Sequence, residues 1–277
     1  MKSIIVFLIV TAIAGAVGWF AGSQGIQVAG YPAYFLCVAL AMGINWVVFL
    51  PSAAFKSDTF YDTTGAITYA TVTAIAAWLS YQHHGGLDWR SLVMAALVIL
   101  WCARRGTFLF IRIHAMGGTD SRFEKIKVNP PRFLVAWALQ GLWVVLTASA
   151  AHVAILSQTR VPVDAFFLAG LAVWMFGFVW ETVADAQKSA FKNDPANKGK
   201  FINVGLWKWS RHPNYFGEIT LWTVILIMAI PVLSGLSWLV GVSPIFVFLL
   251  LTKISGVNLQ MQQGLERWGE DPDYREY

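Results

Sequence analysis

The stretch GLWKWSRHPNYFGE, residues 205–218, places basic, amide and carboxylate side chains directly before a long apolar run. Its side chains with binding or catalytic chemistry are Lys208, Arg211, His212, Asn214, Tyr215 and Glu218. Pro213 disfavours helix at His212, so we expect a turn there and a helix beginning near Asn214 as its N-cap. The N–H groups of that first turn, together with the basic residues, favour a bound phosphate. Glu218 lies one turn further and suits a ribose hydroxyl or an amide.

A plain membrane anchor would account for the basic and aromatic residues of this stretch but not for Asn214 and Glu218. A second polar group precedes it in WETVADAQKSAFKND, residues 180–194. Glu181 and Asp185 are four residues apart and therefore share a helix face. An ionisable group at the membrane boundary is costly and usually has a partner or a function. Two interpretations remain open for this pair, a salt-bridged helix end and part of a ligand site.

The stretch WCARRGTFLFIRIHAMGGTDSRFEKIK, residues 101–127, carries arginines where a membrane helix should reach the inner surface. Guanidinium groups bind phosphates with two parallel hydrogen bonds, and the GGTDSR turn adds backbone N–H groups. These arginines are explained equally well if their positive charge serves only to keep this end of the membrane helix on the cytoplasmic side. The residues that we include from this stretch in a predicted cofactor site are Arg104, Arg105, Asp120 and Arg122.

Asp62 begins a weakly apolar segment in SDTFYDTTGAITYA, residues 57–70, and follows Tyr61. Desolvation at the bilayer boundary favours the neutral form of a carboxyl group. Such a group donates a proton or holds the Tyr61 hydroxyl that donates it. Asp62 and Tyr61 are therefore the predicted catalytic residues, with an N-cap role for Asp62 as the alternative.

The composition defines the elements that must position these groups. The chain is 57% hydrophobic and 13% charged, whereas soluble proteins carry roughly 25% charged residues. We therefore expect an all-α, polytopic integral membrane bundle with about 7–8 transmembrane helices. The expected spans, of which the third is the least apolar, are roughly residues 4–21, 31–51, 65–81, 91–113, 132–156, 163–181, 216–233 and 235–252.

Basic residues predict the orientation of the bundle. They concentrate in residues 104–132, in 182–212 and in the tail, whereas the short connections near 22–30, 157–162 and 234 hold only Arg160. Since basic loops stay cytoplasmic, both ends of the chain and the candidate site are expected inside. We predict one membrane domain, 1–277, whose cofactor site is built from loops at about 104–131 and 182–215 and the tail 253–277.

The formal net charge of +5 agrees with loop charge that contacts anionic membrane lipids. Nothing else in the sequence supports nucleic-acid binding. GxxxxGK[ST], GxGxxG and HExxH are absent from the sequence, and no spacing of His and carboxylates indicates a metal site. We expect neither a metal nor a nucleic acid as partner.

The block 205–218, followed by an apolar helix that contains Trp222, resembles the C-terminal signature of the steroid 5-alpha-reductase-like membrane proteins. FYDTTGAITY, ARRGTFLFIRI and WETVADAQKSAF resemble the corresponding blocks of a bacterial branch, so the resemblance spans about 55–277. It implies an all-helical membrane reductase that binds NADPH from the cytoplasmic side and reduces an activated carbon–carbon double bond.

The resemblance also implies residue roles. Asn214 and Glu218 match the cofactor-binding Asn and Glu of the family motif, and Asp185 matches an Asp on the preceding helix. Glu181 stands where steroid reductases have Asn. The complete predicted cofactor-binding set is Arg104, Arg105, Asp120, Arg122, Glu181, Asp185, Lys188, Lys208, Arg211, His212, Asn214, Tyr215, Glu218 and Arg275.

On the substrate side, Asp62 falls on the catalytic Glu of steroid reductases and Tyr61 on a Gln. Trp101 stands in the region of the catalytic Tyr; its indole donates a hydrogen bond but is no acid, so Tyr61 or Tyr69 would substitute. Trp101 and Trp222 are the predicted substrate-binding residues. The substrate is expected to be a lipophilic, steroid-like molecule that enters from the bilayer of a bacterial inner membrane.

Two other functions stay open. Isoprenylcysteine methyltransferases also carry an RHP-x-Y block before a membrane helix and bind S-adenosylmethionine there. The NYFGE ending and the helix with Asp185 favour the reductase. A lipid-binding membrane protein without catalysis would explain the basic loops but not Asn214, Glu218 and Asp62 together.

Overall fold

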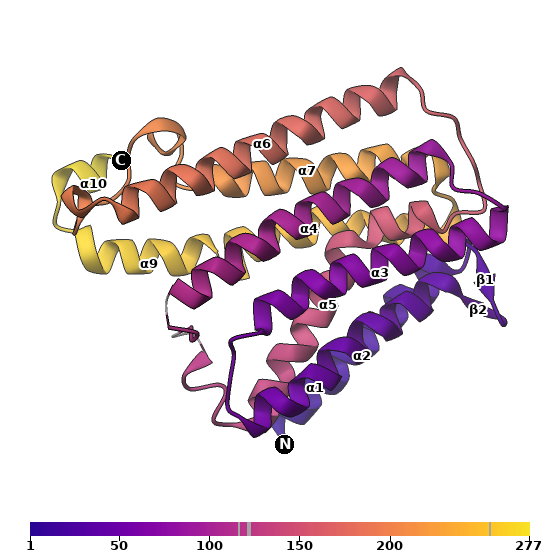
Figure 1. Cartoon of the computed structure of the whole chain (residues 1–277), viewed down its shortest axis with the longest axis horizontal. Helices are drawn as coiled ribbons and strands as arrows, with labels where there is room; N and C mark the ends of the chain where they lie inside the picture. Colours follow the sequence, from indigo (N-terminus) through magenta and orange to yellow (C-terminus); the bar gives the residue numbers. More distant parts are fainter. Residues whose placement is uncertain (116, 121–122, 255) are drawn as a thin grey trace. The chain divides into compact units, whose positions relative to one another are not determined.

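The computed structural model describes residues 1–115, 117–120, 123–254 and 256–277. Apart from one short antiparallel hairpin, the regular elements of this described part are helices (Figure 1). Seven of them are long and apolar enough to cross a membrane. The all-α membrane fold predicted from the composition is therefore confirmed.

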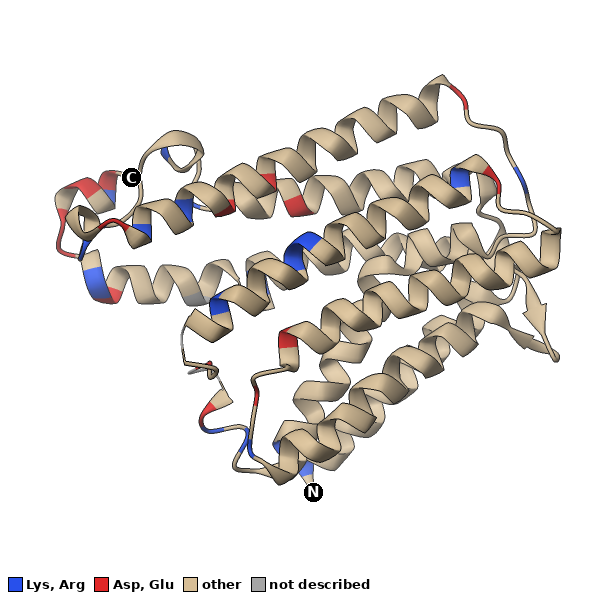
Figure 2. Cartoon of the chain, viewed as in Figure 1, with Lys and Arg blue, Asp and Glu red and all other residues tan. Residues whose placement is uncertain are grey.

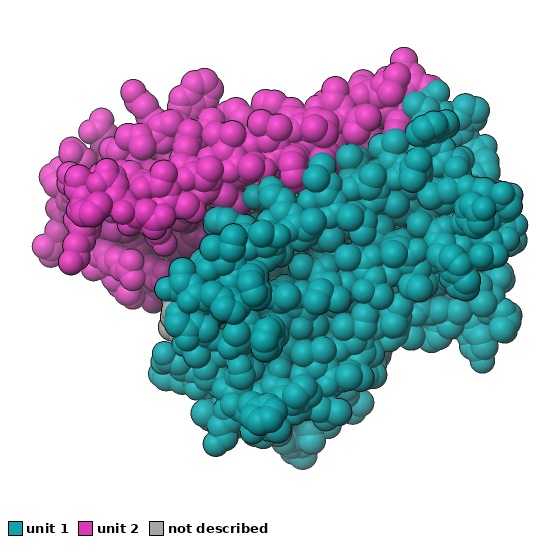
Figure 3. Space-filling model, viewed as in Figure 1, with its two compact units in different colours: residues 1–163, 229–242 teal, residues 164–228, 243–277 magenta. Residues whose placement is uncertain are grey.

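The chain divides into two compact units, coloured teal and magenta in Figure 3. Unit 1 comprises Met1–Val163 and Ala229–Val242, and unit 2 comprises Asp164–Met228 and Ser243–Tyr277. The single membrane domain expected from the sequence stays a prediction.

Unit 1 holds the N-terminal helices. Its elements are α1 (Lys2–Gly22), β1 (Gln27–Val28), β2 (Tyr31–Pro32), α2 (Ala33–Ala54), α3 (Tyr61–His84), α4 (Trp89–Ala115), α5 (Pro130–Ile155), and the 3-10 segments η4 (Ile230–Val232) and η5 (Gly235–Gly241). Local chemistry sets several ends: Asn129 caps α5 by accepting from the Arg132 N–H at 3.3 Å, and Gly85, with φ 69°, ends α3 in the left-handed conformation. The β1–β2 hairpin was not predicted.

α3, the least apolar of the expected spans, is not among the seven membrane-crossing candidates. It packs within unit 1 against α2, α4 and α5. Its buried face is polar: Thr68 accepts from Asn45 Nδ2 at 3.3 Å, and the Gln140 amide donates to Asn45 Oδ1 at 3.0 Å and to the Tyr61 carbonyl at 2.8 Å. These polar groups lie on the face of α3 that packs within unit 1, where they are hydrogen-bonded internally.

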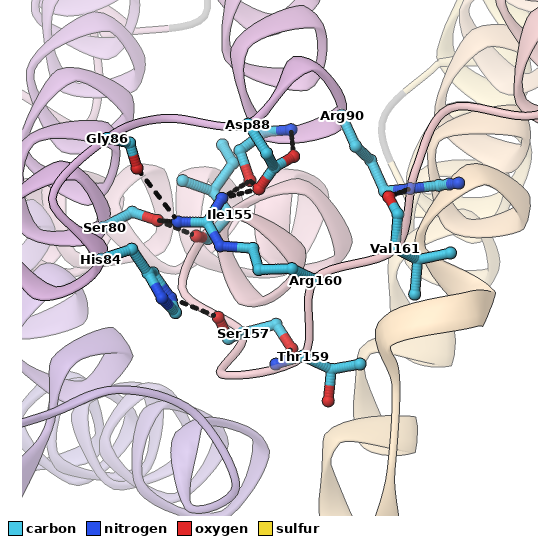
Figure 4. Close-up of polar contacts among 11 residues, drawn as sticks. Ser80, His84, Gly86, Asp88, Arg90, Ile155, Ser157, Thr159, Arg160 and Val161 are labelled. Carbon is cyan, nitrogen blue, oxygen red and sulfur yellow. Dashed lines mark hydrogen bonds and ion pairs between the residues drawn. The ribbon is translucent and has the colours of Figure 1, made fainter.

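Arg160, the basic residue of the connection that follows α5, stabilises the C-terminal end of α3 (Figure 4). Arg160 forms an ion pair with Asp88, and its guanidinium donates to Ser80 Oγ at 3.2 Å and to the Gly86 carbonyl at 3.4 Å. Burial lowers the pKa of Arg160. This charge joins the connection after α5 to the turn between α3 and α4, which is a structural role.

Unit 2 holds the C-terminal helices. Its elements are α6 (Ala165–Asn193), the 3-10 segments η2 (Pro195–Asn197) and η3 (Gly205–Lys208), α7 (Pro213–Ala229, to Met228), α8 (Val242–Leu249, from Ser243), the π-helical η6 (Leu250–Ile254), α9 (Val257–Trp268) and α10 (Pro272–Glu276). α6 has 29 residues and therefore extends well past the roughly 20 residues that span a bilayer. The helix continues beyond the expected span 163–181, as the predicted shared helix face of Glu181 and Asp185 requires.

The expected helix over 235–252 was wrong in its internal structure. The segment passes from the 3-10 helix η5 through α8 to the π-helix η6, although Gly235–Ile254 together remains a membrane-crossing candidate. α9 and α10 were not predicted from the sequence.

α6 and α7 approach each other closely at two glycines. A Cβ atom on Gly217 would lie 2.6 Å from the Gly177 carbonyl oxygen and 2.8 Å from Glu181 Cβ. Small residues allow such close backbone approach between membrane helices. The crossing places the middle of α6, around Gly177 and Glu181, against the first turns of α7.

Candidate ligand-binding site

Four buried polar side chains meet where α6 and α7 cross in unit 2. Glu181 and Glu218 are 0% and 2% exposed, and Asp185 and Asn214 are 6% and 9% exposed. Asn214 Nδ2 donates to Asp185 Oδ1 at 3.2 Å. Figure 2 shows the acidic groups as red segments on α6 and α7. The structure therefore brings together four residues that the sequence assigned to one site.

The start of α7 differs from the prediction. α7 begins at Pro213, and the His212 carbonyl accepts from the Tyr215 and Phe216 N–H groups at 3.1 and 3.3 Å. Asn214 is therefore inside the first turn, and its side chain binds Asp185 instead of capping the helix. Proline suits the first helical position, where its missing N–H is not needed. The predicted N-cap role of Asn214 was wrong.

Arg211 lies close to two aromatic rings of the tail. Its guanidinium carbon is 5.2 Å from the Tyr274 ring centre and 5.4 Å from the Tyr277 ring centre, and Nη2 donates to the Tyr274 carbonyl at 3.2 Å. Among the residues that the structure describes, Arg211 forms no ion pair within 4 Å. Its charge is thus held in place without being neutralised by a carboxylate.

Lys188, on α6, is the second cation of this region. Its ammonium lies 4.7 Å from the centre of the Trp207 ring and donates to Gln260 Oε1 at 3.4 Å. Trp207 is itself fixed by a bond from its indole N–H to the Ala184 carbonyl at 2.9 Å. Lys188 and Arg211 therefore form a cationic rim whose side chains rest on aromatic rings.

His212 is placed differently from a cationic ligand. Its ring stacks on Tyr215 with centroids 5.3 Å apart and 9° between planes. Both ring nitrogens are buried, and neither has a hydrogen-bond partner in the part of the chain that the structure describes. Burial, followed by the charges of Lys188 and Arg211, lowers the pKa of His212 to about 4. The imidazole is neutral near pH 7, so His212 adds hydrogen-bonding capacity rather than positive charge.

Two basic residues of the predicted set are not gathered with the buried group. Lys208 is exposed at the end of η3. Arg275 is exposed on α10, and its Nε donates locally to the Gly269 carbonyl at 2.5 Å. Arg211, rather than Arg275, is the tail-associated cation of the site.

The predicted catalytic residues Asp62 and Tyr61 belong to unit 1. Asp62 lies in the first turn of α3, whose N-cap is Phe60, so the N-cap alternative was wrong. Arg112 Nη2 is 3.5 Å from Asp62 Oδ2, and the Asp62 side chain is 24% exposed. The Asp62 carboxylate therefore has a cationic partner, which the sequence did not indicate. The Tyr61 hydroxyl donates to the Ala136 carbonyl at 2.8 Å.

Three other predicted residues of unit 1 lie on α4. Trp101 is buried, with Tyr69 edge-on to its ring at 5.2 Å and the Arg105 guanidinium 5.9 Å from the ring centre. Arg104 is partly buried. Arg122 lies outside the described residues. Trp222 belongs to α7 in unit 2 and is fully buried.

Asp120, also predicted for the cofactor site, lies in a loop of unit 1 that is held by Asp58. Asp58 Oδ2 accepts from the Asp120 N–H at 2.7 Å, and Asp58 Oδ1 pairs with Lys127 at 2.7 Å. The Asp58 side chain is 1% exposed. Sequence reasoning missed Asp58; its position just before Tyr61 and Asp62 gave no signal of this partner.

Sequence reasoning also missed a shallow pocket on unit 2 and the contribution of the tail. The pocket has a volume of about 370 Å³ and is lined by Gln187, Ala190, Phe191, Asp194, Asn197, Val204 and Gly205. Gln260, Tyr274 and Tyr277 contact the rim cations from α9, α10 and the residue after it. The described residues contain no group of three or more His, Cys, Asp or Glu placed to hold a metal ion.

With this geometry in place, comparison with known proteins defines the family. Residues 48–277 match the model of DUF1295, described as a protein of unknown function, and the chain belongs to this family. The match covers every residue of the α6–α7 site and its rim. DUF1295 is a steroid 5-alpha-reductase-like family, which agrees with the resemblance found in the sequence.

Two curated relatives are similar to parts of the chain. An uncharacterized protein of Schizosaccharomyces pombe is 29% identical over 177 residues, covering 54% of this chain and 51% of its own length. A probable O-methyltransferase of Ustilaginoidea virens is 37% identical over 57 residues, covering 21% of this chain and 20% of its own length. The chain thus spans about half of the first relative and a fifth of the second. No solved structure matches.

Proposed function

We propose that the protein is a membrane-embedded reductase that uses NADPH to reduce an activated carbon–carbon double bond of a lipophilic, steroid-like substrate from the bilayer. The observation that carries the proposal is the buried Asn214–Asp185 pair, with Glu218 beside it, next to a cationic rim. A bacterial inner membrane, with the site facing the cytoplasm, is part of the proposal.

The side chains of this region suit the parts of a dinucleotide. Arg211 and Lys188 supply charge for phosphates, and the neutral His212, whose ring nitrogens have no partner among the described residues, supplies a hydrogen-bonding group. The carboxylates of Asp185 and Glu218 are more deeply buried and accept from ribose hydroxyls or an amide. Keeping acids deep and cations at the rim reduces repulsion between the carboxylates and the phosphates.

Bound NADPH would supply the hydride, and the protein would position the cofactor against the substrate and provide the electrostatic environment for the transfer. Asn214, fixed by Asp185, orients polar groups of the cofactor with its amide. On the substrate side, we propose Asp62 and Tyr61, with Arg112 as a further member: the carboxylate orients the guanidinium, whose charge stabilises negative charge on a substrate oxygen. Tyr61 fixes the start of α3 to α5 through the Ala136 carbonyl.

A thermal-shift comparison on detergent-purified protein tests this proposal. NADPH is expected to raise the melting temperature of the wild type, because a ligand that binds only the folded state stabilises it. Glu218→Gln is expected to reduce this shift. An unchanged melting temperature at saturating NADPH contradicts the proposal.

A methyltransferase that uses S-adenosylmethionine is the second candidate. The 57-residue similarity to a probable O-methyltransferase favours it, and so do three buried carboxylates on α6 and α7, which suit a positively charged sulfonium. Stabilisation by S-adenosylmethionine but not by NADPH would decide for this candidate. Stabilisation by neither would leave a lipid-binding protein without catalysis.

A further inference from the structure

The C-terminal segment contributes a side chain to the ligand site that its sequence did not indicate. Gln260, on α9, contacts two residues of the proposed site that come from different helices. Its Oε1 accepts from the Lys188 ammonium of α6 at 3.4 Å, and its Nε2 donates to the hydroxyl oxygen of Tyr215 on α7. One amide therefore bridges α6 and α7 with both of its polar ends in use.

The backbone before α9 is shaped so that Gln260 can reach Tyr215. The π-helical segment η6 (Leu250–Ile254) directly precedes α9, and π-helical turns often occur at functional sites. A Cβ atom on Gly256 would lie 2.8 Å from Tyr215 Cε2. Only glycine allows the chain to pass this close to the Tyr215 ring, and α9 then begins one residue later.

The groups that Gln260 holds are joined to the rest of the rim. Tyr215 stacks on His212, whose ring nitrogens are buried without a partner in the described part of the chain. Lys188 is held on its other side by the Trp207 ring. A shift of Gln260 would therefore move the ammonium of Lys188 and the ring stack together, and both belong to the proposed ligand site.

We propose that Gln260 is a positioning residue of the ligand site, which fixes the Lys188 ammonium and the Tyr215 hydroxyl from the C-terminal segment. Gln260 has this role only if Lys188 and Tyr215 bind the ligand, as proposed above. The tail is then one wall of the site, and the anionic part of the ligand is recognised through it.

The test compares two changes at Gln260 with the same changes at Gln263, which is exposed on the same helix. Gln260→Met removes both bonds at nearly constant size and is expected to weaken NADPH binding about ten-fold, since a bond to a charged group is lost. Gln260→Glu keeps both contacts, as the carboxylate accepts from Lys188 and from Tyr215, but neutralises the ammonium. It is expected to weaken binding and to reduce its salt dependence.

The matched variants Gln263→Met and Gln263→Glu are expected to bind NADPH like the wild type at every salt concentration. Melting temperatures of all four variants without ligand show that each is folded. Equal affinities and equal salt dependence at the two positions would overturn the role of Gln260, because a purely structural tail would not alter the salt dependence.

The wild type separates this outcome from failure of the proposed function. If wild-type protein binds S-adenosylmethionine and not NADPH, the four variants are titrated with that ligand, and Gln260 keeps its role only if its variants differ from those of Gln263. If the wild type binds neither, both the proposed function and the role of Gln260 are contradicted.

Discussion

Gly217→Ala is expected to force α6 and α7 apart at the crossing that assembles the site. The added Cβ would lie 2.6 Å from the Gly177 carbonyl oxygen and 2.8 Å from the Glu181 backbone nitrogen. Both are backbone atoms, so no side-chain rotation relieves the overlap. Overpacking of this kind costs about 1–3 kcal/mol, or roughly 2–12 °C in melting temperature at about 2–4 °C per kcal/mol.

The assay is thermal unfolding in detergent, together with NADPH titration of the folded variant. Separation of the helices should break the 3.2 Å bond between Asn214 and Asp185 and weaken NADPH binding. Gly43→Ala is the control, because a Cβ on Gly43 in α2 would meet nothing within 4 Å, and alanine there should be neutral or stabilising by up to about 1 kcal/mol. A melting temperature and an affinity for Gly217→Ala equal to those of Gly43→Ala would refute the close crossing.

Three further outcomes are expected. Arg211→Met should weaken NADPH binding about ten-fold through loss of a charge-assisted bond, while Arg267→Met, at an exposed position of α9, should not; equal titrations would contradict the rim. The pKa of His212 is lowered from 6.5 to about 4, so as the pH falls between these values the unfolded chain binds a proton that the folded protein does not, and the stability of the protein should decrease. His212→Phe should make the melting temperature less dependent on pH in this range. Identical pH profiles for the variant and the wild type would count against a buried neutral imidazole. Asp62→Asn and Arg112→Ala should each lower the rate of NADPH-dependent reduction at least about ten-fold without altering NADPH affinity; a normal rate in both would remove the pair from catalysis.

The buried group on α6 and α7 was predictable because its signal is local. Glu181 and Asp185 follow helical spacing, and Asn214 and Glu218 lie in one short motif, so each helix presents its pair before tertiary packing is known. The membrane fold followed from apolar runs for the same reason. Which side chains of this group form hydrogen bonds with each other depends on the close crossing of α6 and α7 at Gly217, and the sequence does not reveal that crossing.

Other features depend on contacts between distant parts of the chain. Gln260 is 72 residues from Lys188 and 45 residues from Tyr215, and nothing in the α9 sequence marks it. His212 looks like a cation in sequence but is neutral, because burial and two neighbouring charges act on it. α3 is less apolar than its neighbours because its polar side chains form hydrogen bonds on the face that packs within unit 1, and Asp62 has a cationic partner in Arg112 at the helix end.

Equilibrium titration with NADPH tests the central claim most directly, using detergent-purified wild type, Asn214→Ala and the control Asn203→Ala, which changes an exposed asparagine of the segment between α6 and α7. The buried Asn214–Asp185 pair predicts saturable binding by the wild type and by Asn203→Ala, and at least about ten-fold weaker binding by a folded Asn214→Ala variant. Absence of saturable binding by the wild type, or equal affinity in all three proteins, would contradict the assignment of this site to NADPH.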